Sequence, residues 1–183
     1  MTEGRALLLG LMRRYLAAVM DPTVTLLEIH KLMYFMQESG QQLRLNYAKG
    51  PYGPYAENLR HVLTCIEGHF VIGYGETADN PDKPLALKPE AVTAAEKFLQ
   101  DHPKIHARFD RVVRLIDGFE TPYGMELLST VHWVARHEGT TTFQEAVKRT
   151  YAWSDRKRMF REEHLRIAWE VLERKGWLAR EEE

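Results

Sequence analysis

The chain has 183 residues, of which 44% are hydrophobic and 28% charged, with 25 basic side chains against 26 acidic ones. A chain of this length buries about 70% of its unfolded surface, so it can fold without disulfides or a structural metal. The net charge of −1 excludes a uniformly basic nucleic-acid binder. The single cysteine excludes an internal disulfide framework and every multi-cysteine metal site. No stretch approaches the roughly 18 consecutive apolar residues of a membrane span, so we expect a soluble, intracellular protein without a membrane partner.

The first two predicted helices form the start of the core. Apolar residues at helical spacing predict a helix from Glu3 to Met20, which Asp21 and Pro22 end. Thr25 and Glu28 have the spacing of a capping box, which opens a second helix from Leu26 to Glu38. This second helix is apolar nearly all round, so we expect it at the centre of the core.

The next segment combines a predicted strand with a rigid loop. Residues 43–47 alternate in polarity and predict a short strand. The segment Lys49–Tyr55 is rich in glycine and proline, which predicts a loop of fixed geometry. We place Pro54 in the first turn of a helix from about Tyr55 to Ile66, with Cys65 on its core side. Residues 70–72 and 85–87 then predict a β-hairpin.

The rest of the chain reads as helical. Helices are predicted at about 89–101, 105–117, 123–138, 143–150 and 158–175, followed by Gly176 as a cap and a short strand at 177–179. The fold class is therefore mainly α (α+β), with about eight helices, a small β-hairpin and a winged-helix-like C-terminal end. We expect one domain over residues 1–183, with an N-terminal half of about 1–102 and a helical half of about 103–183.

Motifs for catalysis are lacking in the sequence. His102 and His106 have the i, i+4 spacing of metal ligands, but Pro103 lies between them and no suitable carboxylate follows. The sequence has neither a nucleophile elbow nor a phosphate-binding loop. From these motifs we expect no enzymatic activity, no cofactor, no metal and no small-molecule substrate.

The charges and the tyrosines suggest two surfaces. Between Glu57 and Asp82 one basic residue stands against five acidic ones, a balance of −4. Tyrosines in and beside the Lys49–Tyr55 loop could stack on a partner, or they could pack the loop onto its neighbours. The basic helices offer a phosphate-binding surface instead, or solvated faces only; their candidate residues are Arg108, Arg111, Arg114, Arg156, Lys157 and Arg158.

Four segments of the N-terminal half and one of the C-terminal half carry a family resemblance. They are His30–Gly40, Leu43–Leu63, Ile66–Gly75, Asp79–Asp82 and Thr121–Ala135. Together they resemble the C-terminal region of DarG antitoxins, and the helix that contains Lys31 and Tyr34 is more distantly similar to the Panacea (SocA-like) antitoxin domains. The glycine- and proline-rich segment Lys49–Tyr55 is the most specific part of the resemblance.

The resemblance implies a toxin–antitoxin role in the bacterial cytoplasm. DarG is the partner of DarT, a toxin that attaches ADP-ribose to thymidine in single-stranded DNA; its macrodomain removes ADP-ribose, and its C-terminal domain binds the toxin and imitates its DNA substrate. We expect this chain to be the toxin-binding domain without the macrodomain, and we do not expect direct DNA binding. The alternatives are a DNA-binding, autoregulatory winged-helix-like domain and a hydrolase acting on ADP-ribosylated DNA. The candidate partner-binding residues are Tyr47, Lys49, Tyr52, Tyr55, Glu57, Glu67, Tyr74, Glu76, Asp79 and Asp82.

Overall fold

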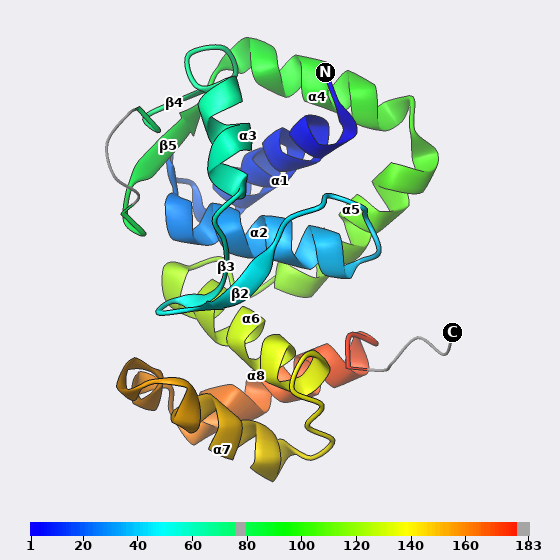
Figure 1. The fold of residues 1–183 in the computed structure, drawn as a ribbon. Helices are drawn as coiled ribbons and strands as arrows, with labels where there is room; N and C mark the ends of the chain where they lie inside the picture. Colours follow the sequence, from blue (N-terminus) through cyan, green and yellow to red (C-terminus); the bar gives the residue numbers. More distant parts are fainter. Residues whose placement is uncertain (76–79, 179–183) are drawn as a thin grey trace.

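The computed structural model describes residues 1–75 and 80–178, and over this part the protein is mainly helical with two small antiparallel sheets (Figure 1). The predicted mainly α fold with a small β part is confirmed. The helices are α1 (Glu3–Val19), α2 (Leu26–Glu38), α3 (Leu59–Ile66), α4 (Pro89–Gln100), α5 (Pro103–Ile116), α6 (Pro122–Arg136), α7 (Phe143–Trp153) and α8 (Glu162–Arg174), with a 3₁₀ turn, η1, at Asp155–Met159. The strands are β1 (Val24–Thr25), β2 (Tyr47–Gly50), β3 (Gly53–Ala56), β4 (Val71–Ile72) and β5 (Pro84–Leu87).

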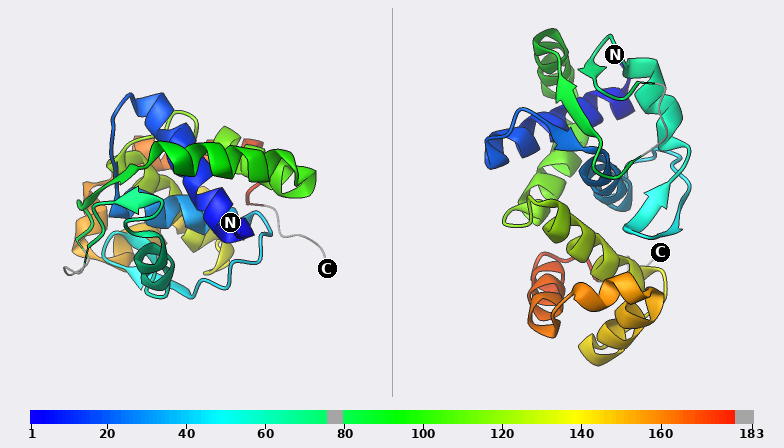
Figure 2. Two further views of the ribbon diagram at one scale, coloured as in Figure 1. Left: turned by 90° about the horizontal axis from the view of Figure 1, so that it is seen from above. Right: turned by 90° about the vertical axis from the view of Figure 1, so that its left-hand side faces the viewer.

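Helix α2 lies at the centre of the molecule, as its apolar pattern predicts. It packs against α1 and α5 on one side and against α6 on the other. Figures 1 and 2 show α1 to α5 and the small strands gathered around it, while α7 and α8 pack on the far side of α6. Eleven of its residues, from Leu26 to Met36, are buried. This burial leaves α2 in contact with both halves of the structure.

The capping box at the start of α2 is present. The Glu28 amide donates to the Thr25 hydroxyl at 3.3 Å, and the Thr25 amide donates to the Glu28 carboxylate at 2.8 Å. The same carboxylate accepts a hydrogen bond from the Tyr15 hydroxyl of α1. The cap therefore also ties α1 to α2.

The predicted pairing of residues 70–72 with 85–87 is confirmed. Strand β4 pairs antiparallel with β5, with Val71 opposite Leu87, and β1 adds to the other edge of β5. The second sheet differs from the prediction. Residues 47–50 and 53–56 form a hairpin, β2–β3, in which Ala48 lies opposite Tyr55. The predicted strand at 43–47 and the helix start at Tyr55 are therefore wrong.

Pro54 explains why the sequence predicted a helix start at Tyr55 in place of the β2–β3 hairpin. Pro54 suits the first turn of a helix, but its lack of an N–H also suits a two-stranded ribbon, where only one edge is paired. Gly53 has φ +94°, which permits the tight turn after Pro51 and Tyr52. Helix α3 then begins at Leu59 and buries Leu63 and Ile66. Cys65 is exposed, contrary to the prediction, because it lies on the other face of that helix.

The predicted bounds of the C-terminal helices are wrong between α7 and α8. Helix α7 continues to Trp153, and the chain then makes the turn η1 before α8 begins at Glu162, rather than at 158. Lys157 in η1 is fully buried, and its ammonium donates to the Glu126 carboxylate of α6. Trp177 and Leu178 lie outside any strand, and Ala179 lies outside the described residues.

Among the helices of the described segments, none combines the length and apolar character needed to cross a bilayer.

Replacing the capping residue Thr25 tests the start of α2. We expect Thr25→Ala to lower the free energy of unfolding by about 1 kcal/mol, because the Glu28 amide loses its acceptor. Urea denaturation monitored by circular dichroism measures the loss. Thr64→Ala, an exposed hydroxyl within α3, is the control and should change stability by less than about 0.5 kcal/mol; an equal loss in both variants would contradict the capping role.

Candidate functional site

The β2–β3 hairpin is held in place by three hydrogen bonds to two helices, α2 and α7. The Tyr47 hydroxyl donates to the His30 carbonyl of α2 at 2.9 Å, and the Trp153 indole of α7 donates to the Gly50 carbonyl at 3.0 Å. The Lys31 ammonium of α2 donates to the Pro54 carbonyl at 2.6 Å. The hairpin lies beside α2 and α6 (Figure 1). Its position is thus set by groups that are far from it in the sequence.

Gly53 allows the hairpin to approach α6 closely. A Cβ at this position would lie 3.1 Å from the Thr130 hydroxyl and 3.5 Å from Lys31 Cε. Any side chain here would therefore meet both α6 and α2, in addition to the strain of a positive φ.

Beside the hairpin lies a charge cluster formed by Lys31, Glu126, Arg156 and Lys157, of which all but the exposed Arg156 are buried. The Glu126 carboxylate of α6 accepts two hydrogen bonds from the Arg156 guanidinium, at 2.9 and 3.2 Å, and one from the Lys157 ammonium at 2.6 Å. Glu126 and Lys157 are at most 1% exposed. This cluster joins η1 to α6, and through Lys31 it lies next to the hairpin.

The two lysines of the cluster have lowered pKa values, chiefly because they are buried. Burial, together with repulsion from Lys157, lowers the pKa of Lys31 to about 7. Burial also lowers the pKa of Lys157, against the attraction of Glu126. Lys31 donates to a carbonyl and has no carboxylate within 4 Å among the described residues.

Aromatic rings line the hairpin on the side of α2 and η1. The Tyr55 ring stacks on His30 at 4.3 Å between centroids, and the Arg156 guanidinium lies 4.3 Å over the Tyr52 ring. Burial lowers the pKa of His30 to about 3, so its imidazole is neutral at neutral pH. His132 of α6 has its pKa lowered to about 3 by burial as well, and its Nδ1 lies 2.8 Å from the Tyr34 hydroxyl.

Two hollows adjoin the hairpin and share Tyr55. One, of about 210 Å³, lies between the tip of the hairpin and the start of α2, and Tyr52, His30 and Pro81 are among its walls. The other, of about 500 Å³, runs along the outward face of the ribbon and includes Glu57. The hairpin thus presents surface on both sides of the Tyr55 ring.

Four of the ten predicted partner-binding residues lie together on the hairpin. Tyr47, Tyr52 and Tyr55 are all half-buried; Tyr47 and Tyr55 make ring contacts with α2, and Tyr52 lies at the tip beside Arg156. The Lys49 ammonium pairs with Glu138 and lies 4.5 Å over the Trp153 ring. Most of this group therefore also supports the hairpin.

The remaining six predicted residues lie outside the hairpin segment, although Glu57 lines the outer hollow and Asp82 follows Pro81 of the hollow beside Tyr52. Glu67 accepts hydrogen bonds from the Gly73 and Tyr74 amides, and the Tyr74 side chain is buried. Glu57 and Asp82 are exposed. Glu76 and Asp79 lie outside the described residues.

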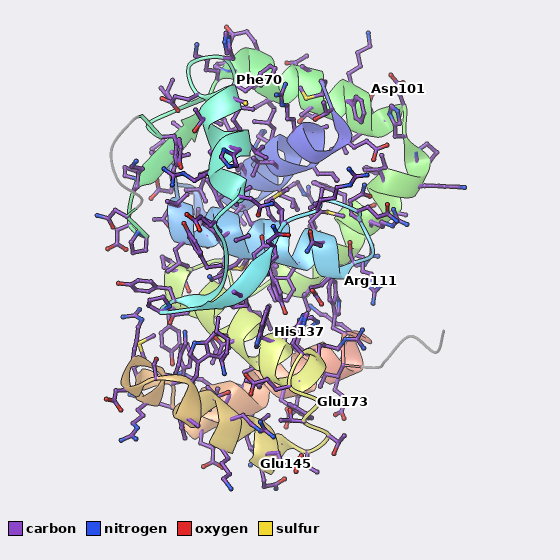
Figure 3. The ribbon with its side chains drawn as sticks, viewed as in Figure 1. Phe70, Asp101, Arg111, His137, Glu145 and Glu173 are labelled. Atoms are coloured by element: carbon purple, nitrogen blue, oxygen red, sulfur yellow. The ribbon has the colours of Figure 1, made fainter. Side chains whose placement is uncertain are left out.

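The basic residues of the alternative DNA-binding surface are largely engaged within the protein. Arg156 and Lys157 are bound to Glu126. Arg111, labelled in Figure 3, lies 4.7 Å over the Trp177 ring and donates to the Gly176 carbonyl. Arg108 donates to the Gln41 side chain at 3.0 Å. Four of the six basic residues proposed for DNA binding therefore make contacts within the protein.

Sequence reasoning missed the residues that organise the site, namely His30, Lys31 and Glu126. A signal was available, because each lies within a helix that is otherwise apolar on nearly all sides. Such charged residues are almost never fully buried unless they are paired. The identity of the partners, however, depends on contacts between α2, α6 and η1.

The candidate metal ligands have other partners. His102 Nδ1 lies 2.7 Å from the Phe98 carbonyl, and His106 lies 3.7 Å from Asp110. Over residues 1–75 and 80–178, no three His, Cys, Asp or Glu side chains come together in a way that could hold a metal ion.

No protein-family model matches the chain. Individual curated proteins do match it, over almost its whole length. It is similar to DNA ADP-ribosyl glycohydrolases. A protein of that name from Thermus aquaticus is 43% identical over 182 residues, covering 100% of this chain, and one from Mycobacterium tuberculosis is 38% identical over 181 residues, covering 92%. The chain spans about half of the length of these relatives, 49% and 51% respectively.

These relatives correct the expectation that the protein is not an enzyme. That expectation is wrong, because proteins that match 92–100% of this chain are named as hydrolases. The sequence motifs considered were those of metal ions and activated nucleophiles. A hydrolase that activates water by general acid–base chemistry need not carry any of them. The names agree with the resemblance to DarG, whose family includes a DNA ADP-ribose-removing activity.

Removing the charge of Glu126 tests the charge cluster. We expect Glu126→Gln to lower the free energy of unfolding by about 3–5 kcal/mol, because the fully buried Lys157 ammonium would lose its counter-ion, and the exposed Arg156 would lose its partner as well. Chemical denaturation measures this loss. Glu163→Gln, which alters an exposed pair with Arg161, is the control and should cost less than about 0.5 kcal/mol. A small loss in Glu126→Gln would contradict the structural role of the cluster.

Acid sensitivity tests the buried histidines. Because the folded-state pKa of His132 is about 3 rather than 6.5, the unfolded chain binds more protons between these values. The free energy of unfolding should therefore fall as the pH is lowered from 6.5 towards 3, by up to about 1.36 kcal/mol per pH unit for each such group. His132→Gln should show a shallower fall in urea denaturation. His69→Gln, at an exposed position, should retain the wild-type slope.

Proposed function

We propose that this chain is part of a DarG-type antitoxin with DNA ADP-ribosyl glycohydrolase activity, and that it binds and neutralises a DarT-type toxin. Its 43% identity to a DNA ADP-ribosyl glycohydrolase over the full length of the chain supports the first part. The resemblance of the hairpin segment Lys49–Tyr55 to DarG antitoxins supports the second. Removal of ADP-ribose from DNA is proposed for the whole protein.

The observation that carries the proposed toxin contact is the fixed position of the β2–β3 hairpin. Hydrogen bonds from the Lys31 ammonium and the Trp153 indole to the hairpin, and from the Tyr47 hydroxyl of the hairpin to the His30 carbonyl, hold the hairpin on its inner side. Its tip, with the half-buried Tyr52, lies beside a hollow of about 210 Å³. A preorganised surface loses little conformational entropy on binding, and a tyrosine beside a pocket is a typical interface anchor.

We further propose that this surface occupies the single-stranded DNA site of the toxin. A cleft that binds single strands is basic and carries aromatic rings. A protein that fills it needs carboxylates and flat groups, and the exposed Glu57 and Asp82, together with Tyr52, have this chemistry. Glu67 is less suited, since its carboxylate already accepts two backbone amides.

A competition assay tests this proposal. A purified DarT-type toxin is bound to fluorescently labelled single-stranded DNA, and the chain is titrated into the complex. We expect the chain to displace the DNA, and the double variant Glu57→Gln, Asp82→Asn to require at least about tenfold more protein, corresponding to two lost charge contacts. Glu163→Gln, which alters a carboxylate on α8, should behave as the wild type.

Two outcomes would contradict the proposal in different ways. If the toxin binds DNA and this chain at the same time, the chain does not occupy the DNA site. If the toxin does not bind the chain at all, the antitoxin role assigned to this segment is wrong.

A further inference from the structure

We infer that the hollow between the tip of the β2–β3 hairpin and the start of α2 binds a small aromatic carboxylate. The hollow has a volume of about 210 Å³ and lies on the side of the molecule where α2 begins (Figure 1). Leu27 and Pro51 are apolar parts of its wall, Tyr52 adds an aromatic ring, and His30 and Lys31 contribute titratable groups. The inference goes beyond the proposed function, because the ligand is a small molecule.

The size of the hollow limits the ligand to about one ring. An apolar cavity of about 150 Å³ takes up benzene, whereas drug-sized ligands and cofactors occupy pockets of about 300–1,000 Å³. A hollow of about 210 Å³ therefore has space for one six-membered ring with a small substituent, and it is too small to enclose a nucleotide. The Tyr52 ring and the apolar side chains of the wall suit the faces and the edge of such a ring.

Two buried donors in the wall of the hollow have unused N–H groups. His30 is 2% exposed, and the Ala56 amide donates to its Nδ1 at 3.5 Å. The proton of the neutral ring therefore lies on Nε2, which has no hydrogen-bond partner among the described residues. The Lys31 ammonium is also buried and has three N–H groups, of which the Pro54 carbonyl accepts one. Two such donors in one wall suit the two oxygens of a carboxylate.

The charge around Lys31 also favours an anion. The nearby carboxylate of Glu126 is already shared by Arg156 and Lys157. When Lys31 is protonated, the charge cluster has three cations and one carboxylate, so a bound carboxylate would supply the second negative charge. Burial and repulsion from Lys157 lower the pKa of Lys31 to about 7, and below this pH the ammonium form prevails. Burying a charged group is favourable only where it gains a partner, and the hollow offers one.

Titration of the protein with benzoate at about pH 6, followed by NMR of the backbone amides, tests the inference. We expect a Kd of about 1 mM, as suits a ligand of this size, with shifts of the Leu27, Tyr52 and Gly53 amides. Benzamide has the same shape without the charge, so it should bind at least about tenfold more weakly. Acetate has the charge without the ring and should also bind at least about tenfold more weakly.

Variants of the wall separate the site from non-specific binding. Lys31→Met should weaken benzoate binding at least about tenfold, because the ammonium is lost. Lys104→Met, at an exposed position on α5, is the matched control and should bind as the wild type. Since Lys31→Met also removes the bond to the Pro54 carbonyl, Leu27→Phe provides a second test: it retains Lys31, narrows the hollow and should weaken binding about fivefold.

Three results would overturn the inference. They are the absence of amide shifts with benzoate at about ten times the expected Kd, equal affinity for benzoate and benzamide, and equal weakening by Lys31→Met and Lys104→Met. Thermal unfolding of each variant verifies that its fold is intact. The titrations contain neither toxin nor DNA, so their failure would leave the proposed function unaffected.

Discussion

The buried Glu126 carboxylate is the constraint on which the arrangement of the structure depends. It lies at most 1% exposed on α6 and binds Arg156 and Lys157 of η1. A charge buried without partners is strongly destabilising, and η1 supplies the partners of Glu126 between α7 and α8. The same cluster places positive charge beside Lys31, whose only described acceptor is the Pro54 carbonyl of the hairpin. The fold of the C-terminal helices and the position of the hairpin are thus coupled.

This coupling explains how a short two-stranded ribbon is kept rigid. A hairpin of four-residue strands is marginal by itself in water. Here Lys31 and Trp153 donate hydrogen bonds to backbone carbonyls of the ribbon, and Tyr47 of the ribbon donates to the His30 carbonyl of α2. Gly53 permits close approach to α6. The inner face of the ribbon is committed to the fold, so its tip and its outer face remain for partners. The proposed toxin contact uses the tip, with Tyr52, and Glu57 beside the outer face.

The distribution of charge differs from what sequence counts suggested. Of the five carboxylates between Glu57 and Asp82, Glu67 binds backbone amides. Arginines that looked like a basic stripe on helices are stacked or bonded within the protein, as Arg111 is over Trp177. Conversely, Arg5 and Arg60 are 55 positions apart in the sequence but line adjoining hollows. Electrostatic surfaces follow tertiary neighbours and not sequence segments.

The sequence by itself determined the helical class, the bounds of α2 to the residue and the β4–β5 pairing, because capping residues, helical periodicity and alternating strands are local signals. It also contained the resemblance that the glycohydrolase relatives support. Only the tertiary structure decided that Pro54 lies in a strand, that Lys157 turns inward and that Lys31 supports the hairpin. These outcomes depend on contacts between residues distant in the sequence, 31 positions apart for Glu126 and Lys157 and 23 for Lys31 and Pro54, and no local pattern specifies such pairings.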